Sequence, residues 1–153
     1  MKTLELKIPP PAVTGIIAAL MWGIARIAPL MDVSAFMRTA AAITLAVAGI
    51  AISLAGILEF RRARTTVNPM KPETTSSLVC SGIYKATRNP MYVGVLFVLL
   101  AWSVFLSSVW ALIGPWAFML YINRFQIVPE ERVLLAMFGS SYSAYTSRVR
   151  RWL

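Results

Sequence analysis

One uncharged stretch constrains the fold more than any other feature, and it runs for 31 residues from Tyr92 to Ile122. A helix crosses the hydrocarbon core of a bilayer with about 20 apolar residues, so this stretch is too long for one span and long enough for two short ones. Ser107 and Ser108 lie near its middle, which predicts a tight helical hairpin. With two earlier apolar stretches, the sequence predicts four membrane helices, at about 11–31, 39–59, 90–106 and 109–124.

The basic residues are distributed unevenly along a chain whose net charge is +9. Apart from Arg26 and Arg38, all of them fall at the N-terminal end, in the 60–90 loop or after Ile122. Cytoplasmic loops carry such an excess, so we expect both termini to be cytoplasmic, in a prokaryotic inner membrane. This pattern favours anionic membrane lipids as partners and argues against nucleic acid. Arg26, near the outer end of the first helix, is expected to extend its side chain to the interface.

The cysteine and histidine content limits the available chemistry. Cys80 is the only cysteine and the chain has no histidine. An intrachain disulfide, a zinc or haem site and a histidine base are therefore excluded, and we expect no metal site. Acid–base chemistry would have to come from carboxylates, tyrosines, lysines or the substrate.

We expect a single all-α membrane domain over residues 1–153, divided into two parts. Residues 1–60 form two scaffold helices, whose small residues would allow close packing in lipid: Ala42, Ala46, Gly49 and Gly56. Residues 61–153 carry nearly all the polar side chains, in a proline-containing loop, the hairpin and short cytoplasmic C-terminal helices. Pro129 predicts the start of the first of these helices, Gly139 its end, and a second helix follows around 140–150.

Arg88, Asn89 and Pro90 directly precede the hairpin. Asn is a preferred N-cap residue and Pro fits the first helical position, so the three residues are explained by a capped membrane helix with an arginine among the headgroups. The same geometry would also bind a carboxylate or phosphate, because a helix N-terminus offers free N–H groups and arginine adds a bidentate donor.

Glu130 and Glu131 also allow two interpretations. They would compensate the dipole of the helix that begins at Pro129. Alternatively, they would bind a cationic or diol-bearing ligand. Because neighbouring helical residues point about 100° apart, one glutamate would face a pocket and the other would pair with Arg124, Arg132 or Arg148.

Four tyrosines follow the same cytoplasmic segments and are either interfacial residues or a surface for stacking a base: Tyr84, Tyr92, Tyr142 and Tyr145. Together with an anion-binding helix start and a carboxylate pair, they would suit a zwitterionic nucleoside ligand. The predicted spans hold almost no polar residues, which argues against a transport pore.

Two segments carry a resemblance to a known family. Residues 65–94 contain L-V-C-S-G-I-Y followed by R-N-P-M-Y-V-G, and residues 128–152 contain E-E and F-G-S-S-Y-S-A-Y. In order and spacing these resemble the isoprenylcysteine carboxyl methyltransferase family over about the last 90 residues. One departure is Asn89, where many members have histidine; asparagine does not titrate near neutral pH, so base catalysis from this position is not expected.

The resemblance implies an integral membrane methyltransferase that uses S-adenosylmethionine at its cytoplasmic face. Arg88, Glu130 and Glu131 would be the catalytic residues, binding polar groups of the cofactor or the acceptor. The implied cofactor contacts lie in the loop, at the hairpin start and on the first glutamate: Leu78, Val79, Tyr84, Arg88, Asn89, Pro90, Met91, Tyr92, Gly94 and Glu130.

The acceptor stays open at this point. It would be a lipophilic or small molecule, such as an isoprenylcysteine-like carboxylate or a thiol. A phospholipid or amine N-methyltransferase is the alternative, although the Gly-x-Gly element of those enzymes does not occur before the hairpin here. A small transporter or assembly protein without catalytic activity would explain the hydrophobicity, but not the concentration of polar residues at 78–94 and 123–148.

Overall fold

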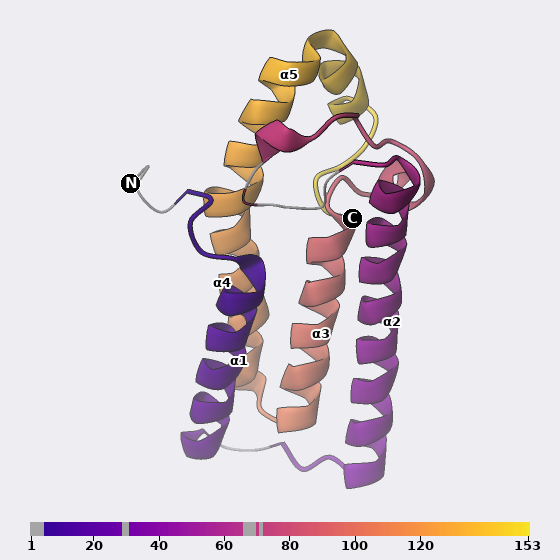
Figure 1. Cartoon of the computed structure of the whole chain (residues 1–153). Helices are drawn as coiled ribbons and strands as arrows, with labels where there is room; N and C mark the ends of the chain where they lie inside the picture. Colours follow the sequence, from indigo (N-terminus) through magenta and orange to yellow (C-terminus); the bar gives the residue numbers. More distant parts are fainter. Residues whose placement is uncertain (1–4, 29–30, 66–69, 71) are drawn as a thin grey trace.

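The computed structural model describes residues 5–28, 31–65, 70 and 72–153, and their regular structure is helical throughout (Figure 1). Four long elements, α1 (Pro10–Ile27), α2 (Ala35–Arg62), α3 (Pro90–Leu106) and α4 (Ile113–Ile122), lie alongside one another. Shorter pieces connect them: η2 (Pro72–Thr74), η3 (Gly82–Lys85) and η4 (Val109–Leu112). The π-helix η5 (Asn123–Ile127) and the helix α5 (Val128–Thr146) complete the order. The predicted all-α class is confirmed.

Two of these helices are long and apolar enough to cross a membrane by length and composition. They are α1, with a mean hydropathy of 1.4, and α2, with 2.3; α3 is apolar but shorter. Large apolar side chains stay exposed on the outward faces of α2 and α4, including Ile43, Val47, Ile50, Trp116 and Leu120. An apolar exterior of this extent is what contact with lipid would require. The prediction of four spans stays a prediction.

Helices α2 and α3 pack backbone to backbone. Ala42, Gly49 and Gly56 are spaced by seven residues on α2 and are buried, as predicted for close packing. A side chain on Gly49 would meet the carbonyl oxygen of Gly94, and one on Gly94 would meet that of Gly49. Ser53 also donates a hydrogen bond of 3.3 Å to the Met91 carbonyl. This contact fixes the first turn of α3 against the C-terminal half of α2.

The chain reverses direction between α3 and α4 at Ser107 (Figure 1). Ser107 adopts a left-handed conformation with φ of 53°, which ends α3, and Ser108 is extended. The Ser107 hydroxyl donates to the Met31 carbonyl at 3.0 Å, and the Met31 N–H donates to the Ser107 carbonyl at 2.7 Å. The turn is therefore tied to the segment that joins α1 and α2.

The fourth predicted helix does not end near residue 124. Instead α4, η5 and α5 form one continuous helix that extends past the bundle (Figure 1). Pro129 lies inside this helix rather than starting a separate one, and it leaves the carbonyl of Phe125 without its usual i+4 donor. The Leu6 N–H donates to that carbonyl at 3.1 Å, and the wider π turn accommodates the proline ring.

Gly139 breaks α5, as predicted. Its φ of 50° and ψ of −121° lie in a region that residues with a side chain rarely occupy. Beyond this kink the chain is helical to Thr146, shorter than the predicted helix around 140–150. Tyr142 is buried on this last part of α5.

Substituting Gly94 with alanine tests the contact between α2 and α3. We expect Gly94→Ala to lower stability by about 1–3 kcal/mol, because the added methyl group would collide with the α2 backbone. The control Gly15→Ala places a methyl group where no atom lies within 4 Å and should not destabilise the protein. Thermal unfolding in detergent measures both; equal midpoints for the two variants would contradict this packing.

Candidate functional site

A cavity of about 460 Å³ lies at the end of the bundle where α2 ends and α3 begins. This volume falls within the roughly 300–1,000 Å³ typical of small-molecule sites. Nine of the predicted site residues line it: Leu78, Val79, Tyr84, Arg88, Asn89, Met91, Tyr92, Glu130 and Glu131. Residues from the 72–89 loop, from the start of α3 and from α5, far apart in the sequence, therefore share one cavity.

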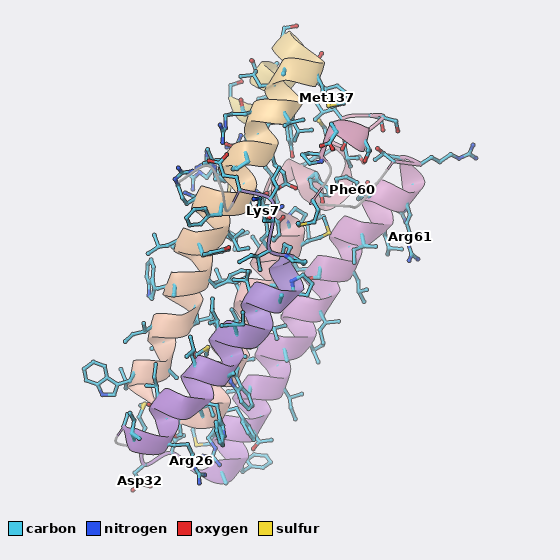
Figure 2. The ribbon with its side chains drawn as sticks, turned by 60° about the vertical axis from the view of Figure 1, so that its left-hand side comes forward. Lys7, Arg26, Asp32, Phe60, Arg61 and Met137 are labelled. Atoms are coloured by element: carbon cyan, nitrogen blue, oxygen red, sulfur yellow. The ribbon has the colours of Figure 1, made fainter. Side chains whose placement is uncertain are left out.

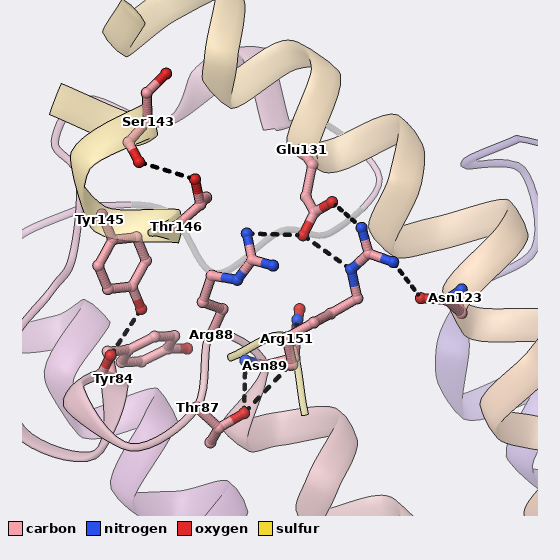
Figure 3. Close-up of polar contacts among 10 residues, drawn as sticks. All are labelled: Tyr84, Thr87, Arg88, Asn89, Asn123, Glu131, Ser143, Tyr145, Thr146 and Arg151. Carbon is pink, nitrogen blue, oxygen red and sulfur yellow. Dashed lines mark hydrogen bonds and ion pairs between the residues drawn. The ribbon is translucent and has the colours of Figure 1, made fainter. Parts of the chain in front are cut away.

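The centre of the site is the carboxylate of Glu131, which lies between two guanidinium groups (Figure 3). Arg88 Nη1 is 3.2 Å from Glu131 Oε1, and Arg151 Nε donates to the same oxygen at 3.1 Å. Arg151 Nη2 also bonds Glu131 Oε2, while its Nη1 donates to Asn123 Oδ1 at 3.0 Å. The network joins the loop before α3, α5 and the C-terminal segment.

Arg88 retains an unused donor. Its Nε is buried and has no hydrogen-bond partner within the described residues, and its side chain is only 14% exposed. A buried N–H without a partner costs on the order of 1–3 kcal/mol, so a ligand acceptor in the cavity would relieve this cost.

Glu130 faces the cavity in a different environment from Glu131. Within the described residues, its one recorded hydrogen bond comes from Tyr92, whose hydroxyl donates to Oε2 at 3.4 Å. Burial raises the pKa of the Glu130 carboxyl from about 4.5 to about 8; the hydrogen bond from Tyr92 opposes this rise, and the charge of Glu131 adds to it. Of the two neighbouring glutamates, Glu131 is therefore paired with two arginines, whereas Glu130 holds a proton near neutral pH.

Asn89 occupies the N-cap position of α3, as predicted, but its side chain does not cap the helix. Its Nδ2 instead donates to the carbonyl of Arg151 at 2.9 Å. Thr87 donates to the same carbonyl at 3.3 Å (Figure 3). The Arg88 N–H donates to the Arg150 carbonyl at 3.0 Å. The C-terminal segment is thereby held against the start of α3.

Pro90 and Gly94 are the two predicted site residues that do not line the cavity. Both face α2, where a side chain on Gly56 would meet the Pro90 ring. The close approach that Gly94 permits is therefore that of the α2 backbone. Both residues position the start of α3 instead of contributing to the cavity wall.

The predicted partners of the second glutamate were wrong. Glu131 pairs with Arg88 and Arg151, whereas Arg124 and Arg132 pair with Glu5. Arg124 of η5 and Arg132 of α5 therefore face the N-terminal segment. Arg148 is exposed and makes no recorded ion pair within the described chain.

Some wall residues were not predicted as part of the site. Pro10, Pro11 and Thr14 come from the start of α1, Phe60 from the end of α2, and Leu134 from α5. The scaffold helices therefore contribute to the cavity, although their sequence carries no polar motif. Phe60 packs edge-on against Tyr84, with ring centroids 5.4 Å apart. In the sequence, the only signal for this contribution was the aromatic residue Phe60 at the end of the second predicted span.

Tyr142 and Tyr145 line the cavity from beyond the kink at Gly139. Tyr145 donates its hydroxyl proton to the Tyr84 carbonyl at 2.7 Å (Figure 3). Burial, as the largest cause, raises the pKa of Tyr142 to about 12, so its hydroxyl stays protonated. The stacking interpretation of the tyrosines stays a prediction.

Comparison with known proteins supplies the family. Residues 37–141 match the sequence profile of the phospholipid methyltransferase family, which is about two thirds of the chain. The chain belongs to this family. The family is part of the isoprenylcysteine carboxyl methyltransferase-like group, so the resemblance found in the sequence is confirmed at the level of that group. Membership of this family makes the protein a membrane methyltransferase.

A curated relative also matches part of the chain. An uncharacterized protein of Haemophilus influenzae is 46% identical over 63 residues, which are its whole length and 41% of this chain. No solved structure matches the chain.

The pH dependence of stability tests the burial of Glu130. Between about pH 5 and 8 the folded protein keeps a proton on Glu130 that the unfolded chain has lost, so this group makes stability fall as pH rises. We expect Glu130→Gln to reduce that fall in thermal midpoints measured at pH 5 and pH 8. The control Glu73→Gln makes the same change at an exposed site and should behave as wild type. An equal fall in all three proteins would contradict the assignment.

Proposed function

We propose that the protein transfers a methyl group from S-adenosylmethionine to a lipophilic acceptor held at the cytoplasmic face of the membrane. The observation that carries the proposal is the cavity in which Arg88, Glu130 and Glu131 meet the loop and the tyrosines. These segments are the ones that carry the family resemblance.

The arrangement in the membrane is part of this proposal. We infer that α1, α2, α3 and the η4–α4 segment each cross the bilayer, with both termini and the cavity on the cytoplasmic side. Lys7, Phe60 and Arg61 lie toward the cavity end of the molecule and Arg26 lies at the other end (Figure 2). The basic residues concentrate at the cavity end, which supports this orientation.

The cavity residues fit the chemical groups of the cofactor. Arg88 offers its buried Nε to a carboxylate, and Glu130 offers a carboxyl group to a cation. The apolar side chains of Leu78 and Val79, with Tyr142 and Tyr145, offer surfaces for a planar base. When bound, the cofactor would supply an electrophilic methyl group on a sulfonium, so the protein has mainly to orient both partners and exclude water.

Among acceptors, a lipid amine suits the cavity best. The nitrogen lone pair would form the new N–C bond while the S–C bond breaks and its electrons remain on sulfur, and one proton must leave the nitrogen. Glu130 would take this proton as a carboxylate, after its own proton, which it holds near neutral pH, has left to solvent; the positive charge of a bound ammonium group favours that loss. The family description supports this class, so the missing Gly-x-Gly element weighs less than the sequence alone suggested.

Methyl transfer in lipid nanodiscs tests the proposal. We expect labelled methyl groups to enter an ethanolamine phospholipid, and Glu130→Gln to slow this transfer about 100-fold or more, because the amide cannot accept a proton. Glu73→Gln, which lies outside the cavity, should keep wild-type activity. An isoprenylated cysteine and a long-chain thiol are assayed in parallel.

The outcomes separate the candidate functions. Transfer to the carboxylate or thiol alone would overturn the amine assignment and retain the enzyme class. If well-folded protein transfers no methyl group and binds no S-adenosylhomocysteine by calorimetry, the enzyme proposal fails and a membrane protein without catalytic activity is favoured.

A further inference from the structure

A second, smaller pocket lies at the end of the bundle opposite to the candidate site. Its volume is about 170 Å³, and it is enclosed by the start of α2, the end of α3 and the turn into α4. Apolar side chains make up most of its wall, together with one arginine and three serines: Met31, Val33, Arg38, Ser103, Val104, Ser107, Ser108, Val109 and Leu112.

Two hydrogen-bond donors in this wall have no partner within the described residues: the Nε of Arg38 and the hydroxyl of Ser108. Ser108 is only 3% exposed. The two other serines are satisfied, because Ser103 donates to carbonyls of α3 and η4 and Ser107 donates to the Met31 carbonyl. Buried donors are nearly always paired in native proteins, so two of them in one pocket point to an acceptor supplied from outside the chain.

The charge of the pocket defines that acceptor. The guanidinium of Arg38 lies 5.7 Å from the centre of the Phe105 ring, and it takes part in none of the ion pairs of the described residues. An anionic oxygen would satisfy both the cation and the Ser108 hydroxyl. A small polar ion would gain nothing from the surrounding valine and leucine side chains, whereas a lipid would bury its glycerol and upper acyl carbons there.

The position of the pocket relative to a bilayer agrees with this chemistry. Arg38 lies in the first turn of α2 and Phe60 near its end, about 33 Å apart along the helix axis at 1.5 Å per residue. The hydrocarbon core of a bilayer is about 30 Å thick. If Phe60 lies near one interface, Arg38 lies near the headgroups of the other.

We propose that this pocket binds the phosphate group of a phospholipid in the leaflet opposite to the cofactor cavity. Arg38 and Ser108 donate hydrogen bonds to phosphate oxygens, and the apolar wall holds the adjoining part of the lipid. The bound lipid stabilises the turns that connect α1 to α2 and α3 to α4. This site is separate from the proposed methyl transfer and does not depend on it.

Thermal unfolding of the purified protein in detergent tests the proposal with three additives. We expect dioleoyl phosphatidylglycerol to raise the unfolding midpoint in a concentration-dependent way, because a ligand of the native state stabilises it. Dioleoylglycerol, which lacks the phosphate, and inorganic phosphate, which lacks the lipid, should each have little effect. A rise as large with inorganic phosphate would overturn the assignment to a lipid, and so would a rise as large with dioleoylglycerol.

Three substitutions locate the effect on the protein. Arg38→Gln and Ser108→Ala should each abolish most of the rise caused by phosphatidylglycerol. Arg26→Gln is the matched control, since Arg26 is an exposed arginine at the same end, does not line the pocket and lies over Trp22. Ser108→Ala removes an unpaired donor, so it should fold with a midpoint near that of wild type without lipid. A full rise in both pocket variants would contradict the proposal.

Discussion

The carboxylate of Glu131, held between Arg88 and Arg151, is the interaction on which the cavity depends. It joins three parts of the chain: the residues before α3, the first turn of α5 and the C-terminal segment. The side chains of Glu131 and Arg88 are less than one fifth exposed, so the charge of Arg88 without Glu131 would be poorly solvated. Removing one partner of a buried pair generally costs more than the pair contributes, which makes the network an all-or-none element of the site.

Two further contacts hold the residues of this network in position. The contact between Gly49 and Gly94 fixes where along α2 the helix α3 begins, and thereby the position of Arg88. The loop is fixed to α2 from the other side, because the Ser81 hydroxyl donates to the carboxylate of Glu59. At the far end of the bundle, the smaller pocket also combines an arginine with a serine hydroxyl inside an apolar wall: Arg38 and Ser108.

Much of the fold and site could be predicted because it rests on local patterns. Apolar run lengths gave the bounds of α1, α2 and α3 to within about four residues, and the Asn89–Pro90 pair gave the start of α3. The continuous helix through Pro129 could not be predicted, because the backbone partner of the freed Phe125 carbonyl is Leu6, more than 100 residues away. The role of Arg151 could not be predicted either, because it is one of several arginines in the C-terminal tail. Its pairing with Glu131 depends on where this tail lies in the folded protein.

A double-mutant cycle on cofactor affinity tests the central claim most directly: that the paired Arg88 and Glu131 form one side of a nucleoside-binding cavity. The affinity for S-adenosylhomocysteine would be measured by calorimetry in Arg88→Ala, Glu131→Gln and the double variant. We predict that each single substitution weakens binding and that the double variant binds little worse than the weaker single one, because the residues act as a unit. Additive losses, or unchanged affinity in all three folded variants, would contradict the account.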